Sequence, residues 1–286
     1  MKVMKTIVTV AGVAAIAMGL SAVSLASADV KVSKEIQQAV DGSSRSADAK
    51  ARDADRHPAQ ALAFWGLKPK SVILEVQPGG GWWTEILAPY AKANKGEFYA
   101  TGSDLSDPGL SEGARKGRAD FEAKYADANV YGKVNVVNWG PKAAPLPANK
   151  FDFVLAARVF HGWSGQGRVD ANLSNIFQAV KPGGVLAIEQ HRGNPGQDPA
   201  VKGGYVTEQA VIDAATKAGF VLDGKSEINA NPKDTKDHPF GVWTLPPVRQ
   251  SSPNAQTPVA ADFDRAKYDA IGESDRMTLR FVKPRK

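Results

Sequence analysis

The stretch "SVILEVQPGGGWW" (residues 71–83) decides the fold of this chain. An apolar run ends in Glu75, three glycines follow at Gly79 to Gly81, and a segment of helical composition spans 82–93. A short apolar run bounded by turn residues predicts a strand buried on both faces. The glycines leave the backbone open to close approach, and the next helix presents free N–H groups at its start. The stretch therefore predicts a ligand-binding turn, although it is neither the G-x-G-x-x-G pattern nor a P-loop, since no G-K-[ST] follows.

Apolar strands alternate with helices over most of the remaining chain. This alternation predicts an α/β fold, with a parallel sheet covered by helices on both faces. The stretch 276–284 alternates in polarity and has no helix before it, so we expect it to pair antiparallel with the 220–228 strand as an edge strand. Predicted strands cover 71–76, 97–101, 133–139, 151–157, 184–190, 220–228 and 276–284, and predicted helices cover 33–64, 82–93, 111–127, 167–181 and 206–219.

Residues 1–28 have the pattern of a secretory signal peptide. Lys2 and Lys5 form a basic start, residues 6–23 are apolar apart from Gly, Ser and Thr, and the small residues Ala26 to Ala28 form a cleavage site. We expect cleavage after Ala28 and a periplasmic or secreted protein. The alternative is an uncleaved membrane anchor, because the apolar run is nearly long enough to span a bilayer.

Residues 29–286 are expected to form a single domain, because a chain of this length can bury a sizeable core by itself. Residues 29–70 are predicted to be a helical extension before the first strand, with a second helix that begins at Pro58, because proline is tolerated in a first turn. Residues 229–275 are rich in Pro, Asn, Asp and Ser, and connections of that length without regular structure are usually functional or disordered. We interpret 229–275 as a lid-like insertion before the last predicted strand.

The composition excludes several classes of partner. The formal charge of +6 falls to +4 without residues 1–28, because Lys2 and Lys5 are lost with them. No run of Lys or Arg indicates a nucleic-acid site. The chain has no cysteine, which excludes disulfides, thiolate metal sites and a lipidated cysteine. We therefore expect a small-molecule substrate, no nucleic acid and no stable membrane anchor after cleavage, and the oligomeric state stays open.

Polar side chains collect after the predicted strands, where an open parallel sheet binds its ligands. Three of the four histidines lie there: His161 and His191 directly after strands, and His238 in the segment beyond the 220–228 strand. The fourth, His57, precedes the first strand in a segment that can fold over the same edge. We predict that at least two of them line one pocket. The candidate residues for substrate or lid contacts are His57, Arg192, Asn229, Asn231, Asp237 and His238.

Two kinds of chemistry can use such a cluster. A histidine oriented by a carboxylate such as Glu189 acts as a general base near neutral pH. The same side chains can instead hold a divalent metal, but no tight ligand spacing such as H-x-x-x-H occurs, so we predict no metal site. Arg158 and Arg192 can bind an acidic substrate group or form salt bridges that fix the loops, and both alternatives stay open. The candidate catalytic residues are His161, His191, Glu189 and Arg158.

The chain resembles the class I S-adenosylmethionine-dependent methyltransferases. "LEVQPGGG" is similar to the family's first motif, "FDFVLAAR" to its fourth, and "AVKPGGVLAIEQ" to the signature of its fifth strand. More narrowly, "ARDADRHP", "PGGGWWTEILAPY", "EINANPKDTKDHPFGVWTLPP" and "IGESDRMTLRF" are similar to a group of exported proteins that are predicted methyltransferases. The resemblance implies a Rossmann-like, seven-stranded sheet that is mostly parallel, with one antiparallel edge strand and helices on both faces.

The resemblance also implies S-adenosylmethionine as the cofactor. Carried over residue by residue, the cofactor-binding positions are Glu75, Gln77, Gly79, Gly80, Gly81 and Asp104. Gln77 stands where the family has its first glycine. Gly102 stands where the family has an acid for the ribose hydroxyls, with Asp104 two residues later.

These departures separate the functional hypotheses. The first is a methyltransferase for an unknown small-molecule acceptor. The second is an exported enzyme of another class, such as a lyase, isomerase or hydrolase, and the third is a small-ligand-binding protein that reuses the fold. Cofactor contacts at Gln77 and Gly102 would favour the first hypothesis.

Overall fold

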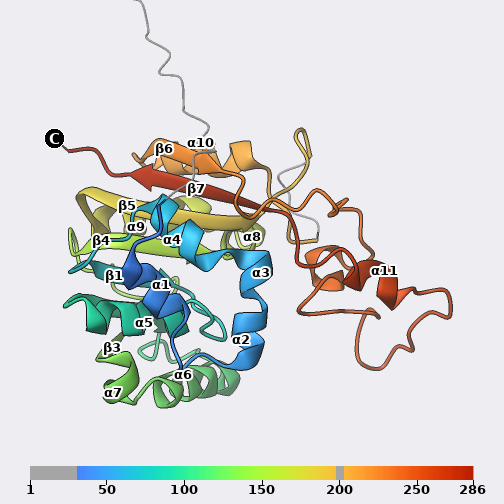
Figure 1. Cartoon of the computed structure of the whole chain (residues 1–286), viewed down its shortest axis with the longest axis horizontal. Helices are drawn as coiled ribbons and strands as arrows, with labels where there is room; N and C mark the ends of the chain where they lie inside the picture. Colours follow the sequence, from blue (N-terminus) through green and yellow to red (C-terminus); the bar gives the residue numbers. More distant parts are fainter. Residues whose placement is uncertain (1–30, 198–202, 286) are drawn as a thin grey trace, which may run out of the picture.

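A computed structural model describes residues 31–197 and 203–285 and shows one seven-stranded sheet with helices on both faces (Figure 1). The strand order is β3-β2-β1-β4-β5-β7-β6. Strands β1 to β5 pair in parallel, and β7 pairs antiparallel with both of its neighbours. The strands are β1 (Val72–Val76), β2 (Glu97–Ser103), β3 (Val134–Trp139), β4 (Phe151–Ala157), β5 (Val180–His191), β6 (Val221–Ser226) and β7 (Arg276–Val282).

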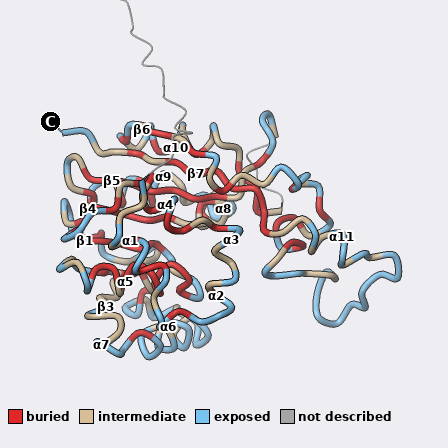
Figure 2. The backbone as a smooth tube through the Cα atoms, viewed as in Figure 1, coloured by how far each residue is buried: buried red, intermediate tan, exposed pale blue. Residues whose placement is uncertain are grey.

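Alternate strand residues build two hydrophobic cores. Ile73 and Phe153 face one core, which α1, α4 and α5 cover, while Leu74 and Val154 face the other, which α9 and α10 cover. The sequence periodicity therefore gives a sheet that is buried on both faces (Figure 2). The helices are α1 (Lys34–Val40), α2 (Ala47–Ala51), α3 (Asp53–Arg56), α4 (Pro58–Trp65), α5 (Thr84–Ala93), α6 (Glu112–Lys124), α7 (Ala128–Tyr131), α8 (Phe160–Gly165), α9 (Val169–Ala179), α10 (Glu208–Lys217) and α11 (Arg265–Asp269), with a 3₁₀ turn η1 (Gly241–Thr244).

The antiparallel strand was predicted at the sheet edge, and this detail is wrong. β7 lies between β5 and β6, so β6 is the outermost strand. Burial explains the order: Met277, Thr278 and Leu279 of β7 are all fully buried, whereas Val221 of β6 is 52% exposed. A strand that is buried on both faces belongs inside the sheet, and a more exposed strand tolerates the edge.

Several predicted boundaries also shift. The predicted helical segment 33–64 consists of four helices, α1 to α4. The last of them begins at Pro58, as predicted, directly after His57 adopts a left-handed φ of 42°. Proline in the first turn starts a new helix because that position needs no N–H donor. The helix predicted from residue 82 begins at Thr84, after the turn that contains Trp82 and Trp83.

The lid-like insertion, 229–275, contains η1 and α11 and is otherwise irregular. It forms the lobe that projects from one end of the sheet (Figure 1), and much of its surface is exposed (Figure 2). Over residues 31–197 and 203–285, no helix has the length and apolar character to cross a membrane. The predicted signal peptide, residues 1–28, lies outside the described residues.

Candidate functional site

Two cavities meet at the turn after β1. The lid cavity, of about 490 Å³, lies between the ends of β1 and β4, the segment 46–52 and the insertion. The α6 cavity, of about 370 Å³, lies between the ends of β1 and β2 and helix α6. Both are lined by Gln77, Pro78 and Gly79. The site therefore forms a two-part cleft at the carboxyl ends of the parallel strands, where open α/β sheets bind ligands.

Gln77 has the backbone shape that a glycine adopts easily. Its φ of 50° is left-handed, which costs a non-glycine residue about 1–2 kcal/mol. Two hydrogen bonds hold it there: its N–H donates to Thr101 Oγ1 at 2.7 Å, and its Oε1 accepts from Trp163 Nε1 at 2.5 Å. The departure from the family motif thus changes the side chain, while the turn keeps a left-handed residue at this position.

The three glycines of the turn have different roles. A Cβ added to Gly79 or Gly80 would meet nothing within 4 Å, so the backbone there is open to a ligand. A Cβ on Gly81 would lie 1.9 Å from the Tyr125 hydroxyl, so that glycine is required by packing. The open segment lines the lid cavity, and the cofactor contacts at Gly79 and Gly80 stay a prediction.

Glu75 lies buried at the end of β1 and lines the lid cavity. Its Oε2 accepts a hydrogen bond from Thr84 Oγ1 at 2.6 Å. Burial raises the pKa of Glu75 to about 7, although the hydrogen bond from Thr84 and the nearby Arg158 oppose the shift. The carboxyl group can therefore respond to a bound cation by losing its proton near neutral pH.

The α6 cavity differs from the family pattern. A Cβ on Gly102 would lie 2.5 Å from Arg118 Cδ, so the arginine occupies the space of any longer side chain at this position. Asp104, the predicted substitute for the ribose acid, accepts hydrogen bonds from Ser106 N and Oγ at 3.0 and 2.6 Å. Asp104 lines neither cavity, so its predicted cofactor contact is not supported by this geometry.

The structure brings His161 and His191 together, with ring centroids 5.7 Å apart. His191 lines the lid cavity, and its Nδ1 lies 2.5 Å from Ser274 Oγ. His161 stands behind it, 3.2 Å from Gln190 Nε2, and contacts Trp243 of the insertion. Burial and the positive charge of Arg158 lower the pKa of both histidines, that of His191 strongly. Both rings are therefore neutral near pH 7, the state in which imidazole accepts a proton.

Glu189 and Arg158, the other predicted catalytic residues, lie at different depths. Glu189 is buried below the cavity, and its Oε1 accepts from Arg276 Nη1 at 2.7 Å. Burial alone would raise its pKa, but Arg276, Arg158 and Arg56 together lower it. Arg158 lines the lid cavity itself. Glu189 therefore acts on the site through the arginines, while Arg158 is placed to touch a ligand.

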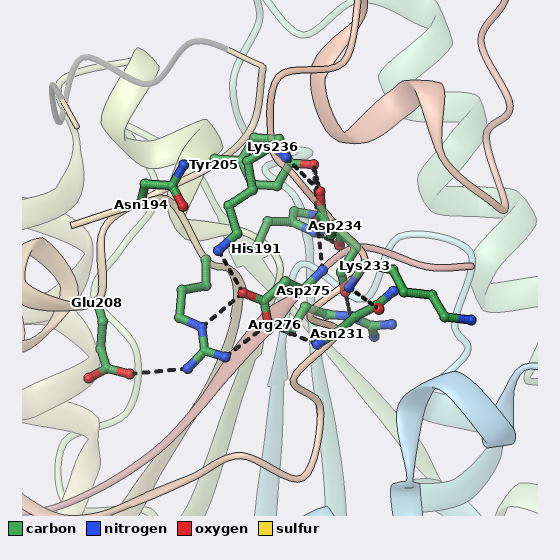
Figure 3. Close-up of polar contacts among 12 residues, drawn as sticks. His191, Asn194, Tyr205, Glu208, Asn231, Lys233, Asp234, Lys236, Asp275 and Arg276 are labelled. Atoms are coloured by element: carbon green, nitrogen blue, oxygen red, sulfur yellow. Dashed lines mark hydrogen bonds and ion pairs between the residues drawn. The ribbon is translucent and has the colours of Figure 1, made fainter. Parts of the chain in front are cut away.

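The predicted substrate and lid residues anchor the insertion and do not line the lid cavity. Asp275 is the centre of this anchor: it pairs with Arg192 at 2.9 Å and Lys236 at 2.9 Å and accepts from Asn231 N at 3.0 Å (Figure 3). The Asp275 N–H donates a further hydrogen bond to the Asp234 carboxylate. The remaining contacts are His57 Nδ1 with Asn229 Oδ1 at 3.2 Å, His238 Nε2 with Asp234 Oδ1 at 2.8 Å, and Thr235 Oγ1 with the exposed Asp237 at 2.5 Å.

Sequence reasoning missed several residues of the lid cavity wall. Arg52 reaches it from the "ARDADRHP" segment, with Arg56 behind it on Glu273, and Glu273 and Ser274 reach it from the segment just before β7. Their signal was the spacing of two arginines four residues apart, which puts both on one face of a helix. Among the described residues, no group of three His, Asp or Glu side chains is placed to hold a metal ion.

Residues 74–188 match the family model of the methyltransferase domain. Over 128 residues the chain is 31% identical to the hybrid PKS-NRPS synthetase tasS of Hapsidospora irregularis. The matched region is 44% of this chain and only 3% of that protein. It is similar in fold to the [4+2]-cyclase SpnF, with a TM-score of 0.52, 16% identity and 82% of each chain covered. It is also similar to a putative sarcosine dimethylglycine methyltransferase from Galdieria sulphuraria, with a TM-score of 0.51, 14% identity and coverage of 86% and 90%. Residues 74–188 are therefore similar to a methyltransferase domain, and they include the glycine turn that both cavities share.

Proposed function

We propose that the chain is an S-adenosylmethionine-dependent methyltransferase for a small-molecule acceptor. The observation that carries the proposal is the two-part cleft whose halves share the glycine turn after β1. The backbone at Gly79 and Gly80 faces open space there, as a turn that holds a ligand requires. The domain match over residues 74–188 supports the same activity.

The cofactor would supply the methyl group, and the residues of the chain would position the cofactor and the acceptor. Glu75, Gly79 and Gly80 would hold the amino-acid end of the cofactor, because they line the lid cavity beside the turn. Phe121 and Trp139 line the α6 cavity and would offer aromatic faces to an adenine ring. The acceptor would then enter from the lid cavity. Transfer of a methyl group mainly requires positioning and exclusion of water, which a cavity closed by the insertion provides.

His191 is the residue we assign as proton acceptor. It lines the lid cavity, its ring is neutral, and Ser274 fixes its orientation through Nδ1. His161 supports it from behind and contacts Trp243 of the insertion. This places the base on the acceptor side of the cleft.

Binding of the cofactor tests the proposal. The purified chain is titrated with S-adenosylmethionine and S-adenosylhomocysteine by calorimetry and by thermal denaturation. A ligand at 100 times its dissociation constant stabilises the folded protein by about 2.7 kcal/mol. Absence of heat and of a shift in melting temperature at millimolar cofactor would reject the proposal.

One observation favours the alternative of an exported enzyme of another class, or a small-ligand-binding protein, that reuses the fold. Arg118 fills the space at Gly102 where the family has an acid for ribose. The similar [4+2]-cyclase also shows that this fold is not confined to enzymes named as methyltransferases. Transfer of a radioactive methyl group from labelled cofactor to an extract of small molecules separates the two functions, since only a methyltransferase labels an acceptor.

We also propose that the reaction takes place in the periplasm or outside the cell, on the basis of the signal-peptide pattern over residues 1–28. Mass spectrometry of protein from the periplasm or the medium should give an N-terminus at Asp29. Full-length protein found only in the cytoplasm would contradict this assignment.

A further inference from the structure

Near the inner end of the lid cavity, arginines outnumber the carboxylates that pair with them, although the cavity wall as a whole also holds Asp48, Glu75 and Glu85. Arg52 and Arg158 line this end, and Arg56 and Arg276 lie behind it on Glu273; we call these four residues the arginine cluster. The carboxylates that form ion pairs with this cluster are Glu189 and Glu273. Buried ionic groups are normally matched by opposite charges, because taking a charge out of water is costly. The cluster therefore carries an excess of cations at a ligand cavity.

Most of the ion pairs converge on Glu273. Its Oε1 accepts from Arg52 Nε at 2.7 Å, and its Oε2 accepts from Arg56 Nε at 2.9 Å and from Arg276 Nη2 at 2.8 Å. Arg276 also donates to Glu189, so it alone is paired with two carboxylates. Three arginines thus share one carboxylate, which cannot satisfy all their donors.

Several donors of the cluster have no partner. Arg52 Nη2, Arg158 Nε and both terminal nitrogens of Arg56 are buried and make no hydrogen bond within the described residues. No hydrogen bond or ion pair joins the Arg158 guanidinium to any residue of 31–197 or 203–285. Unpaired buried donors are rare in folded proteins, because a buried donor without an acceptor destabilises the folded state. Their concentration at one cavity indicates that something outside the chain completes them.

The backbone of Arg158 points to the same conclusion. Its φ of 58° is left-handed, and its N–H is fixed by a 2.6 Å hydrogen bond to the Glu189 carbonyl. Non-glycine residues in this region are strained and are found preferentially at functional sites. Burial, followed by the positive charge of Arg158, lowers the pKa of Arg56 to about 9. Burial also lowers the pKa of Arg158. Both shifts mean that the nearby carboxylates, Glu189 and Glu273, do not fully offset the burial of these cations.

We propose that the lid cavity binds its acceptor through an anionic group, a carboxylate or a phosphate, held by Arg158 and Arg52. Both side chains line the cavity, and their free donors match the oxygens of a planar or tetrahedral anion. The same cavity is lined by His191 and Ser274, so an anion on the arginines places the rest of the molecule beside the base. This inference deepens the proposed function and depends on it in identifying the bound molecule as the methyl acceptor. The anion site itself is inferred from the arginine cluster alone.

The test uses inorganic phosphate and malonate as probes of the full chain, with chloride at matched ionic strength as the reference. Calorimetry and thermal denaturation are recorded for the wild type, Arg158→Gln, Arg52→Gln and the control Lys217→Gln. Lys217 is exposed on α10 and pairs with Asp170, outside both cavities, so this control removes one positive charge without touching the site.

We expect at least one probe to bind the wild type and the control equally. Arg158→Gln should weaken that binding at least tenfold while the chain still unfolds cooperatively, because the Arg158 guanidinium makes no hydrogen bond or ion pair within the described residues. Arg52→Gln, whose side chain is 27% exposed, should fold normally and weaken binding by a smaller factor. Failure of both probes to bind the wild type, or equal affinity in wild type and Arg158→Gln, would overturn the proposal.

A titration with S-adenosylhomocysteine identifies which molecule carries the anion. If the acceptor carries it, Arg158→Gln leaves the affinity for this cofactor product within about twofold, and phosphate still binds when the product is present. If Arg158→Gln instead weakens the cofactor product tenfold, or the product excludes phosphate, the anion site belongs to the cofactor carboxylate and our assignment is wrong. Lack of any cofactor binding to the wild type would reject the proposed function but leave the anion site measurable.

Discussion

Arg118 of the α6 cavity and Arg158 of the lid cavity are the same residue type on either side of one turn, yet their surroundings are opposite. Arg118 Nη1 donates to the Ser103 carbonyl at 2.9 Å and to Asn138 Oδ1 at 3.0 Å, and its Nε pairs with Glu122 at 2.6 Å. The side chain of Arg158 has no such partner within the described residues. The completeness of the hydrogen bonds, rather than the presence of an arginine, separates a structural cation from one that awaits a ligand.

The contrast extends to the two cavities. The wall of the α6 cavity is complete without a ligand, because Arg118 also donates to the Val136 carbonyl at 3.2 Å and covers Gly102. The inner end of the lid cavity holds unpaired donors and a strained residue, Arg158. We therefore expect substitutions in the first region to alter stability, and substitutions of unpaired groups in the second to alter binding.

The largest effect is expected from Arg276→Met, which tests the paired part of the arginine cluster. It would leave the buried Glu189 without its 2.7 Å ion pair, and breaking a buried pair costs about 3–5 kcal/mol. Urea denaturation measures the loss. The control Arg280→Met lies on the same strand, but its partner Asp223 is 40% exposed, so it should cost about 1 kcal/mol or less. Equal losses in the two variants would show that Arg276 is not a structural cation.

Glu75→Gln should change the pH dependence of stability by up to about 3 kcal/mol, because one pKa unit corresponds to about 1.4 kcal/mol. Burial first of all raises the pKa of Glu75 from 4.5 to about 7, so the folded state holds the proton more tightly than the unfolded state. Stability is therefore greatest below pH 4.5 and is lost as pH rises towards 7. Glu75→Gln should flatten this decline, as followed by urea denaturation at several pH values.

The matched control is Glu112→Gln, an exposed residue in the first turn of α6. It should leave the pH profile of the wild type unchanged. A wild-type profile that does not fall between pH 4.5 and 7 would contradict the assignment of Glu75.

The smallest effect is expected from Arg118→Gln, and it bears most directly on the comparison. Loss of its charged hydrogen bonds to Ser103, Asn138 and Val136 should lower the free energy of unfolding by about 1–3 kcal/mol. Phosphate binding should stay as in the wild type, in contrast to Arg158→Gln. The distinction between the two arginines fails if Arg118→Gln keeps full stability and weakens phosphate binding.

The parallel part of the fold was predictable because each apolar run is short and contiguous. The runs around Leu74, Val154 and Leu186 became β1, β4 and β5. The place of β7 in the sheet was not predictable, because the alternation in the sequence indicated a strand but not which neighbours would bury both of its faces. The pairing of β7 with both β5 and β6, and the full burial of Met277 and Leu279 on one face and of Thr278 on the other, decide that it lies inside.

The site was predictable where it follows strand ends. Arg158 and His191 come directly after β4 and at the end of β5, and both line the lid cavity. The arginine cluster was not predictable, because Arg52 and Arg56 pair with Glu273 across more than two hundred residues. Gln77 gives the opposite lesson: its side chain departs from the motif, but its φ of 50° preserves the turn. Residue identity at a turn therefore does not fix backbone shape.

The position of β7 between β5 and β6 has a consequence for assembly. While the chain is being made, β5 has an open edge and β6 has no strand to pair with until residues 276–282 emerge. Glu273, Ser274 and Arg276 arrive with the same segment and close the inner end of the lid cavity. One late insertion step thus completes the sheet and the binding site together, so a nascent chain that stops short of β7 has neither.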